Sequence, residues 1–254
     1  MAKVSIITVA KNHALGLHDT YSSLSYQEFS DWELLVVVGA SKDSTLQVAK
    51  EISNIDSRIK VIEQSGLGIY DAMNGGIRDA SGEYSWFMNA GDRFADAQVL
   101  GVAVDEITNA AIGMVIGGYR IDGGNKKQVY AYPKKEITAF NFAFNRHGGC
   151  HQAMIFQTEV LKRIGGFSLN YSLCSDFELV IKVINTAGAL RVPEIFADIE
   201  PGGAADLGIF SVHQQKHQIR KSLFGDLGVT FLSLGWTFAA HTKVILRRFL
   251  QDRF

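Results

Sequence analysis

Asp92 is one of two acidic positions where a side chain could do chemistry. It ends residues 87–92 (Phe-Met-Asn-Ala-Gly-Asp), where an apolar run gives way to small residues. A carboxylate that follows a buried strand projects from the edge of a sheet. Hard cations such as Mg²⁺ take one or two carboxylates together with phosphate oxygens of a substrate. The residues alone therefore leave Asp92 either a metal ligand or a turn or helix N-cap residue.

The second acidic position is the pair Asp176 and Glu178, in residues 174–179 (Cys-Ser-Asp-Phe-Glu-Leu) ahead of an amphipathic run. At a helix start, Asp176 would cap the helix and face a cleft, while Glu178 would turn to another side. A carboxylate in a cleft could act as a general base toward a hydroxyl. The alternative is a plain N-cap with an acidic first turn.

Residues 66–74 (Gly-Leu-Gly-Ile-Tyr-Asp-Ala-Met-Asn) combine two glycines with a helix start. Glycine lets a ligand approach the backbone, and the first N–H groups of a helix attract an anion. A strand-to-helix turn without a ligand explains the same residues. A dinucleotide fingerprint, and with it a nicotinamide oxidoreductase, matches poorly because Asp71 replaces the third glycine and the segment follows the third strand.

Two histidines, His147 and His151, lie four residues apart in residues 146–152 (Arg-His-Gly-Gly-Cys-His-Gln). On a helix they could share a metal ion, but the paired glycines between them argue against a helix and so against a zinc site. His151 could contact a sugar or a phosphate, or satisfy a buried backbone group.

These side chains need strands and helices to position them. Short apolar runs predict strands at residues 4–9, 32–38, 59–63 and 83–88, with helices at 12–24, from 41–45 to about 52, and at 70–80. The alternation predicts an α/β fold with a parallel sheet covered on both faces. Ligands on such sheets bind at the carboxyl ends of the strands. That rule points to residues 8–11, 38–43, 66–71 and 89–92.

The second half of the chain is less regular. Its pattern predicts strands at residues 114–119 and 128–132, joined by a turn at 122–125, and helices at 159–164, 176–185 and from 207 to the end. A boundary near residue 205 follows a Glu-Pro-Gly-Gly segment.

Composition narrows the class of protein. The formal net charge of −1 lacks the basic footprint that nucleic-acid binding usually demands. The two cysteines, Cys150 and Cys174, form neither a disulfide framework nor a zinc site, and they suit a reducing compartment. The N-terminal residues lead directly into a strand, without the pattern of a signal peptide. These features predict a cytoplasmic protein.

Residues 227–242 contain no Asp, Glu, Lys or Arg, and the basic residues Lys243, Arg247, Arg248 and Arg253 follow. The apolar stretch is shorter than the roughly 20 residues of a spanning helix. Two interpretations remain: an interfacial helix on an anionic leaflet, which would be the inner face of the membrane, or packing against the domain or a second subunit.

Taken together, these segments resemble family 2 glycosyltransferases of the GT-A fold, especially bacterial members that build surface polysaccharides. The resemblance spans roughly residues 3–205 and rests on seven segments in the family's order: 5–9, 31–45, 68–77, 81–92, 151–154, 164–167 and 175–179. It implies a central, mainly parallel sheet flanked by helices, with a catalytic domain at residues 1–205 and a helical C-terminal extension at 206–254.

The resemblance also implies roles for individual residues. Asp92 would bind Mn²⁺ or Mg²⁺ that bridges the diphosphate of a nucleotide-sugar donor, and Asp176 would be the general base, with Glu178 as the fallback. The remaining donor-binding positions would be Thr8, Gly68, Asp71, Asn74, Asn89, His151 and Gln152, the last two also near the acceptor. The implied reaction is a single inverting displacement by a hydroxyl of a glycan or lipid-linked saccharide.

This chain departs from the family pattern at two places. Val38 stands where members usually carry an Asp that reads the base, so base recognition would pass to Ser41 or Asp43. Asn89 and Gly91 replace the first acids of the metal motif. These departures keep open an alternative function, that of a non-catalytic nucleotide- or glycan-binding member of the same fold.

Overall fold

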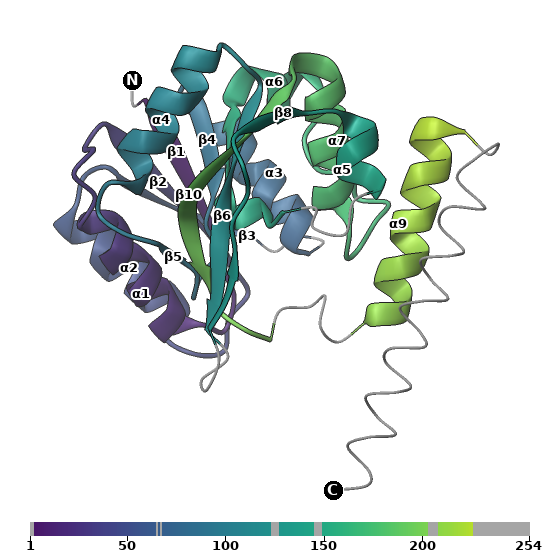
Figure 1. The fold of residues 1–254 in the computed structure, drawn as a ribbon. Helices are drawn as coiled ribbons and strands as arrows, with labels where there is room; N and C mark the ends of the chain where they lie inside the picture. Colours follow the sequence, from purple (N-terminus) through teal and green to yellow (C-terminus); the bar gives the residue numbers. More distant parts are fainter. Residues whose placement is uncertain are drawn as a thin grey trace, which may run out of the picture.

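The computed structural model describes residues 3–64, 66, 68–122, 127–144, 149–202 and 208–225. In this part a mixed sheet runs through the molecule in the order β3-β2-β1-β4-β9-β6-β10-β5, with β7 paired to β6 and β8 paired to β10 (Figure 1). The predicted turn at 122–125 and the boundary near 205 fall largely outside the described residues, as do His147 and the segment 227–254.

The first half follows the predicted alternation. It consists of β1 (Val4–Ala10), α1 (Ala14–Ser25), β2 (Trp32–Gly39), α2 (Thr45–Ile55), β3 (Ile59–Gln64), α3 (Ile69–Asp79) and β4 (Tyr84–Phe87). Strand β1 pairs in parallel with both β2 and β4, and β2 pairs in parallel with β3. The strands β1 and β2 are buried on both faces, which explains their continuous apolar runs.

The second half of the chain adds strands that pair in both parallel and antiparallel fashion, together with further helices. They are β5 (Arg93–Phe94), α4 (Val99–Ala110), β6 (Met114–Asp122), β7 (Lys127–Tyr130), β8 (Lys135–Ile137), α5 (Ala139–Phe144), the 3₁₀ turn η1 (His151–Ala153), β9 (Met154–Gln157), α6 (Thr158–Arg163), α7 (Ser175–Ala187), β10 (Ala189–Ile199) and α9 (Ile209–Phe224). Strand β9 runs antiparallel to both neighbours, β4 and β6, so the sheet is parallel from β3 to β4 and mixed beyond it.

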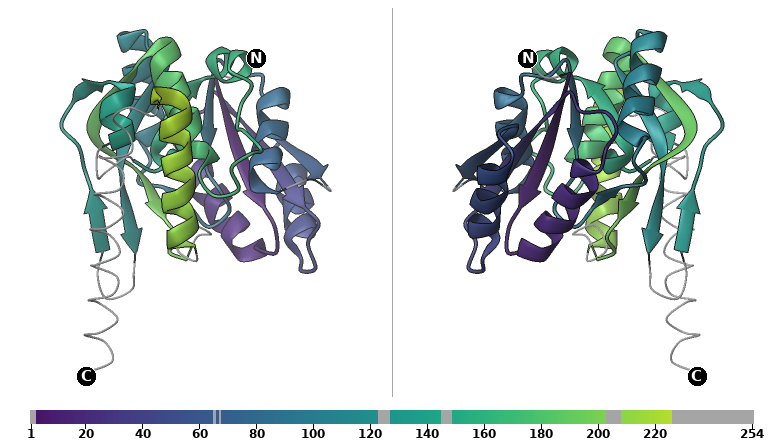
Figure 2. Two further views of the ribbon diagram at one scale, coloured as in Figure 1. Left: turned by 90° about the vertical axis from the view of Figure 1, so that its right-hand side faces the viewer. Right: turned by 90° about the vertical axis from the view of Figure 1, so that its left-hand side faces the viewer.

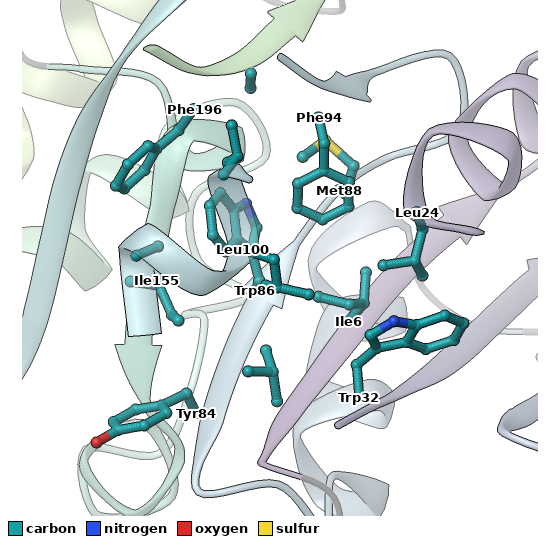
Figure 3. Close-up of a cluster of buried hydrophobic side chains, with 14 of the residues drawn as sticks. Ile6, Leu24, Trp32, Tyr84, Trp86, Met88, Phe94, Leu100, Ile155 and Phe196 are labelled. Atoms are coloured by element: carbon teal, nitrogen blue, oxygen red, sulfur yellow. The ribbon is translucent and has the colours of Figure 1, made fainter. Parts of the chain in front are cut away.

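Two apolar layers cover the sheet, as the alternation of β1 shows. Ile6 packs with α1, α2 and α4 on one face, whereas Ile7 packs with α3, α6 and α7 on the other (Figure 2). Trp86 of β4 lies inside the first layer, 5.2 Å from the ring of Phe94 and 5.3 Å from that of Phe196 (Figure 3). The two layers hold the strand ends in place from both sides. No helix in the described part is long and apolar enough to cross a bilayer.

The amino ends of the parallel strands are joined by one buried carboxylate. Glu33 accepts hydrogen bonds from the hydroxyls of Ser5 and Ser81, from the Ser81 N–H, and from Nζ of Lys60, at 2.7–2.9 Å. Burial raises the pKa of Glu33, but these donors outweigh it and lower that pKa to about 2. The charged form of Glu33 therefore stabilises the fold.

We expect Glu33→Gln to lower the free energy of unfolding by roughly 3 kcal/mol at pH 7. The lowered pKa contributes stability above about pH 4.5, and this contribution is lost as the pH falls toward about 2. Urea unfolding at several pH values measures the difference. Glu63→Gln, at an exposed carboxylate that pairs with Lys50, is the control and should cost little. A deficit that does not shrink at low pH would contradict this role.

Candidate active site

The carboxyl ends of β1, β2 and β3 open into a cavity of about 550 Å³. Lys11, Gly39, Gln64, Gly68 and Asn89 are among the residues that line it. Gly68 precedes α3 with φ of +116°, a conformation that favours glycine. The first N–H groups of α3 begin at this cavity, so its chemistry suits a negatively charged ligand.

Asp92 follows Asn89 and Ala90, which line this cavity, in the loop between β4 and β5, and it is 5% exposed. Its Oδ1 accepts the backbone N–H of Glu200 at 2.9 Å, and its Oδ2 accepts Nε2 of Gln152, also at 2.9 Å. Burial raises the pKa of Asp92 to about 6, although both hydrogen bonds oppose the rise. The two hydrogen bonds do not offset the free-energy cost of burying the charged carboxylate, and a bound cation would lower that cost.

The backbone at position 91, directly before Asp92, favours glycine over an acidic residue. Its φ is +101°, and a Cβ there would lie 2.0 Å from Oε2 of Glu200. That Glu200 oxygen lies 2.6 Å from Nε2 of His13, which lines the cavity. Thr20 holds the same turn, since its hydroxyl lies 2.7 Å from the Asp92 carbonyl oxygen and accepts the Gly91 N–H. A side chain at position 91 would displace Glu200.

A metal ion fits this site only with help from a ligand. Among the described residues, no group of three His, Cys, Asp or Glu side chains is arranged to hold a cation. Asp92 offers one carboxylate, and the buried Oδ1 of Asn89 has no hydrogen-bond partner. Two oxygens of this kind suit Mg²⁺ or Mn²⁺ when phosphate oxygens complete the shell.

Asp176 lies in the first turn of α7, between two side chains from distant parts of the chain. Tyr70 donates its hydroxyl to Oδ1 at 3.1 Å, and Nδ1 of His151 lies 3.3 Å from Oδ2. Nε2 of His151 lies 3.4 Å from Nδ2 of Asn89. Burial favours the neutral acid, but His151 and the charge of Lys216 outweigh it and keep the pKa of Asp176 below its usual range. Asp176 is therefore ionised at neutral pH.

A second cavity, of about 400 Å³, opens on the other side of His151. Asp176, His151, Tyr119, Tyr130 and Lys216 line it. Asn89 lines the first cavity and His151 lines the second, so their contact joins the walls of the two cavities. A group could be transferred at this contact between a ligand in the first cavity and a ligand in the second.

Three other sequence-predicted residues lie apart from the cavities. Thr8 is fully buried and its hydroxyl has no partner, while the chain after it, including Lys11, lines the first cavity. Glu178 is 7% exposed, and its Oε1 pairs with Nζ of Lys182 at 3.0 Å. Asn74 binds the backbone of Phe167 through both amide atoms, at 2.7 and 2.8 Å.

Ser41 and Asp43 connect the loops after β1 and β2. Ser41 accepts the N–H of Asn12 at 3.1 Å, and Oδ1 of Asn12 accepts the N–H of Lys42 at 2.7 Å. Asp43 accepts the N–H groups of Thr45 and of the first residue of α1. Both side chains thus accept hydrogen bonds from backbone N–H groups, and Val38 is buried in the core.

Asp71 and Gln152 complete the predicted set. Asp71 accepts a hydrogen bond from Nε2 of Gln64, which lines the first cavity. Gln152 joins Asp92 to Cys150, whose thiol lies 2.6 Å from its Oε1. The structure thus brings Asn89, Asp92, His151, Gln152 and Asp176 together, with Gly68 and Asp71 at the far side of the first cavity.

The sequence interpretation missed Tyr70, His13 and Glu200. Tyr70 is 106 residues from Asp176, and His13 is 187 residues from Glu200. A carboxylate directly after a strand is the only local signal at Glu200, and it is the same signal that selected Asp92.

We expect the raised pKa of Asp92 to make stability fall as the pH rises. Between about pH 4 and pH 6 the folded protein keeps a proton that the unfolded chain has lost. Relative to Asp92→Asn, the wild-type free energy of unfolding should drop by roughly 2 to 3 kcal/mol across this window. Urea unfolding in EDTA at pH 4.5 and 7.5 measures it. Parallel pH profiles for the two proteins would contradict the shifted pKa.

Comparison with known structures places the fold. TarS from S. aureus in complex with UDP-GlcNAc superposes with a TM-score of 0.72 at 18% identity, covering 91% of this chain and 69% of that one. The mannosyltransferase PcManGT from Pyrobaculum calidifontis, in complex with GDP-Man and Mn²⁺, gives 0.66 at 17% identity, covering 88% and 64%. The chain therefore has the GT-A glycosyltransferase fold.

Sequence comparison gives the family. An uncharacterized glycosyltransferase of Mycobacterium tuberculosis is 26% identical over 228 residues, 88% of this chain and 81% of the relative. A PGL/p-HBAD biosynthesis glycosyltransferase of Mycobacterium bovis is 29% identical over 180 residues, 70% and 68% respectively. The family model described as glycosyl transferase family 2 matches residues 5–165. The chain belongs to glycosyl transferase family 2 and is a transferase-class enzyme.

Proposed function

We propose that the protein is an inverting glycosyltransferase that moves a sugar from a nucleoside-diphosphate donor to an acceptor hydroxyl in polysaccharide or glycan biosynthesis. The observation that carries this proposal is the chain of contacts from Asn89 through His151 to Asp176. It connects the first cavity, suited to a nucleotide diphosphate, with the second cavity, which holds an ionised carboxylate.

The donor would occupy the first cavity with its diphosphate near Gly68 and Asp92. Bound Mn²⁺ or Mg²⁺ would supply positive charge against the negative charge of the departing diphosphate. Asp92 and Asn89 are the residues that would hold it. Two solved relatives in complex with Mn²⁺ support a divalent cation.

Asp176 would take the proton of the acceptor hydroxyl while that oxygen attacks the anomeric carbon and the bond to the diphosphate breaks. Tyr70 and His151 each hold one carboxylate oxygen, so the carboxylate has a fixed orientation. Its lowered pKa keeps it in the proton-accepting form at neutral pH. One displacement inverts the anomeric configuration.

We expect one nucleotide sugar from a panel to raise the melting temperature when Mn²⁺ is present, because a ligand of the folded state stabilises it by mass action. With that donor, Asp176→Asn should lower turnover by about 10²–10⁴-fold and keep the donor-induced shift. Donor turnover and thermal shift are measured on the same preparations.

Glu178→Gln is the matched control on the same helix, since Glu178 pairs with Lys182 instead of facing His151. It should keep turnover within a few-fold. If Asp176→Asn turned over at the wild-type rate, Asp176 would not be the general base. Donor binding without transfer or donor hydrolysis by the wild type in Mn²⁺ would instead favour a non-catalytic binding member of the family.

The acceptor we propose is a glycan or a lipid-linked saccharide, and the chain would meet it in the cytoplasm at the inner face of the membrane. Residues 226–254, which lie outside the described part, supply the sequence argument: a charge-free stretch followed by four basic residues.

The full chain should sediment with liposomes that contain anionic lipid, and a chain that ends at residue 225 should stay in the supernatant. Neutral liposomes are the control, because the basic residues need negative charge. The full chain could instead sediment with neither kind of liposome and behave as a dimer in analytical ultracentrifugation. That result would assign the tail to a subunit contact.

A further inference from the structure

Two cations of α9 face the same aromatic ring of α7. Nζ of Lys216 lies 5.0 Å from the ring centre of Phe177, and the guanidinium carbon of Arg220 lies 5.3 Å from it. The two residues are one helical turn apart, where like charges repel each other. Helix α9 runs beside α5 and α7, so the pair faces inward (Figure 1). An arrangement that brings two positive charges to one partly buried position has an electrostatic cost.

Within the described residues, no carboxylate lies within salt-bridge distance of either cation. Other partly buried cations of this chain do have such a partner: Arg120 pairs with Asp198 and Lys182 with Glu178. Arg220 donates to the backbone oxygen of Ala143 at 2.8 Å. In the described part of the chain, Lys216 contacts the Phe177 ring and senses the more distant charge of Asp176. A partly buried lysine without a carboxylate partner leaves its charge available to a ligand that carries a negative charge.

Lys216 lines the second cavity together with Asp176 and His151. Another wall of that cavity is aromatic: the rings of Tyr119 and Tyr130 stack with centres 4.5 Å apart and planes 14° apart. Flat aromatic surface and a few convergent polar groups are typical of small-molecule pockets. The cavity therefore offers a small polar molecule an apolar wall, a base and one cation.

We propose that Lys216 makes this cavity selective for an acceptor saccharide that carries an oxyanion, either the carboxylate of an acidic sugar or a phosphate. The inference rests on the proposed function, which places the acceptor beside Asp176. Lysine binds such groups through charge-assisted hydrogen bonds, which are about twice as strong as neutral ones. Arg220, one turn away, adds positive potential at the same end of the cavity.

A different role for Lys216 predicts a different result. If its charge only keeps Asp176 ionised, then its removal affects neutral and acidic acceptors equally and moves the acid limb of the pH–rate profile. Under our proposal, removal raises KM for acidic acceptors more than for neutral ones. Lys216→Arg keeps the charge and should restore most of the selectivity.

Binding can be tested without any transfer reaction. Titration calorimetry with methyl glucoside, glucuronic acid and glucose 1-phosphate is carried out on the wild type, Lys216→Met, Lys216→Arg and Lys11→Met. Lys11 lines the first cavity, so Lys11→Met reports an anion that binds there instead. We expect one or both anionic sugars to bind the wild type at least tenfold more tightly than methyl glucoside, and Lys216→Met to lose that advantage.

The two anionic sugars distinguish a carboxylate from a phosphate. Equal affinity for all three sugars, or an anion preference that Lys11→Met abolishes and Lys216→Met keeps, would overturn the inference. Both results would leave sugar transfer itself intact, and transfer is measured separately with the donor found by thermal shift. Loss of transfer with retained anion binding at Lys216 would instead count against the proposed function alone.

Discussion

The buried carboxylate of Asp92 is the interaction on which the site depends. A charge in a low-dielectric environment has to be met by donors, and here the donors come from the end of β10 and from η1. Residues 92, 152 and 200 are thereby fixed to one another although the chain between residues 92 and 200 contains six strands of the sheet, β5 to β10. The hydrogen bonds of Asp92 set the position of His151, which is the neighbour of Gln152, and of Glu200.

The sheet carries one buried carboxylate at each end, and the two differ in their supply of donors. Glu33 at the amino ends has hydrogen bonds from three residues and a pKa of about 2, so it needs nothing more. Asp92 at the carboxyl ends has two hydrogen bonds and a pKa of about 6. The difference separates a carboxylate whose charge is fully met by donors from one whose charge is only partly met.

The sequence predicted the first half of the fold well, because its strands are continuous apolar runs and its helices are bounded by turn residues. It missed β10, in which Pro193 interrupts an apolar run and the pairing with β6 shifts register after Arg191. It also missed β9, whose four residues, Met154–Gln157, are too few for a periodic pattern. Antiparallel β9 is what makes the sheet mixed.

The predicted roles of the site residues stay predictions, although the structure brings Asn89, His151 and Asp176 together. Sequence reasoning selected residues where family order added to local pattern, and it stopped where partners are far apart in the chain. Asp92, His151 and Asp176 were ambiguous as single residues. Tyr70 and Glu200 become visible only when the sheet brings their loops together. In the structure, Asn74 and Asp43 bond to backbone groups of nearby loops, and their predicted part in donor binding stays a prediction.

The hydrogen bonds that join Asn12 of the first loop to Ser41 and Lys42 of the second have a consequence for evolution and engineering. Each loop supplies the other with a donor and an acceptor, and Asn12 holds a positive φ of 51° to do so. A loop exchanged alone from a relative would lose its counterpart and shift the floor of the cavity. Changes in what the first cavity binds should therefore be inherited, or transplanted, as a pair of loops.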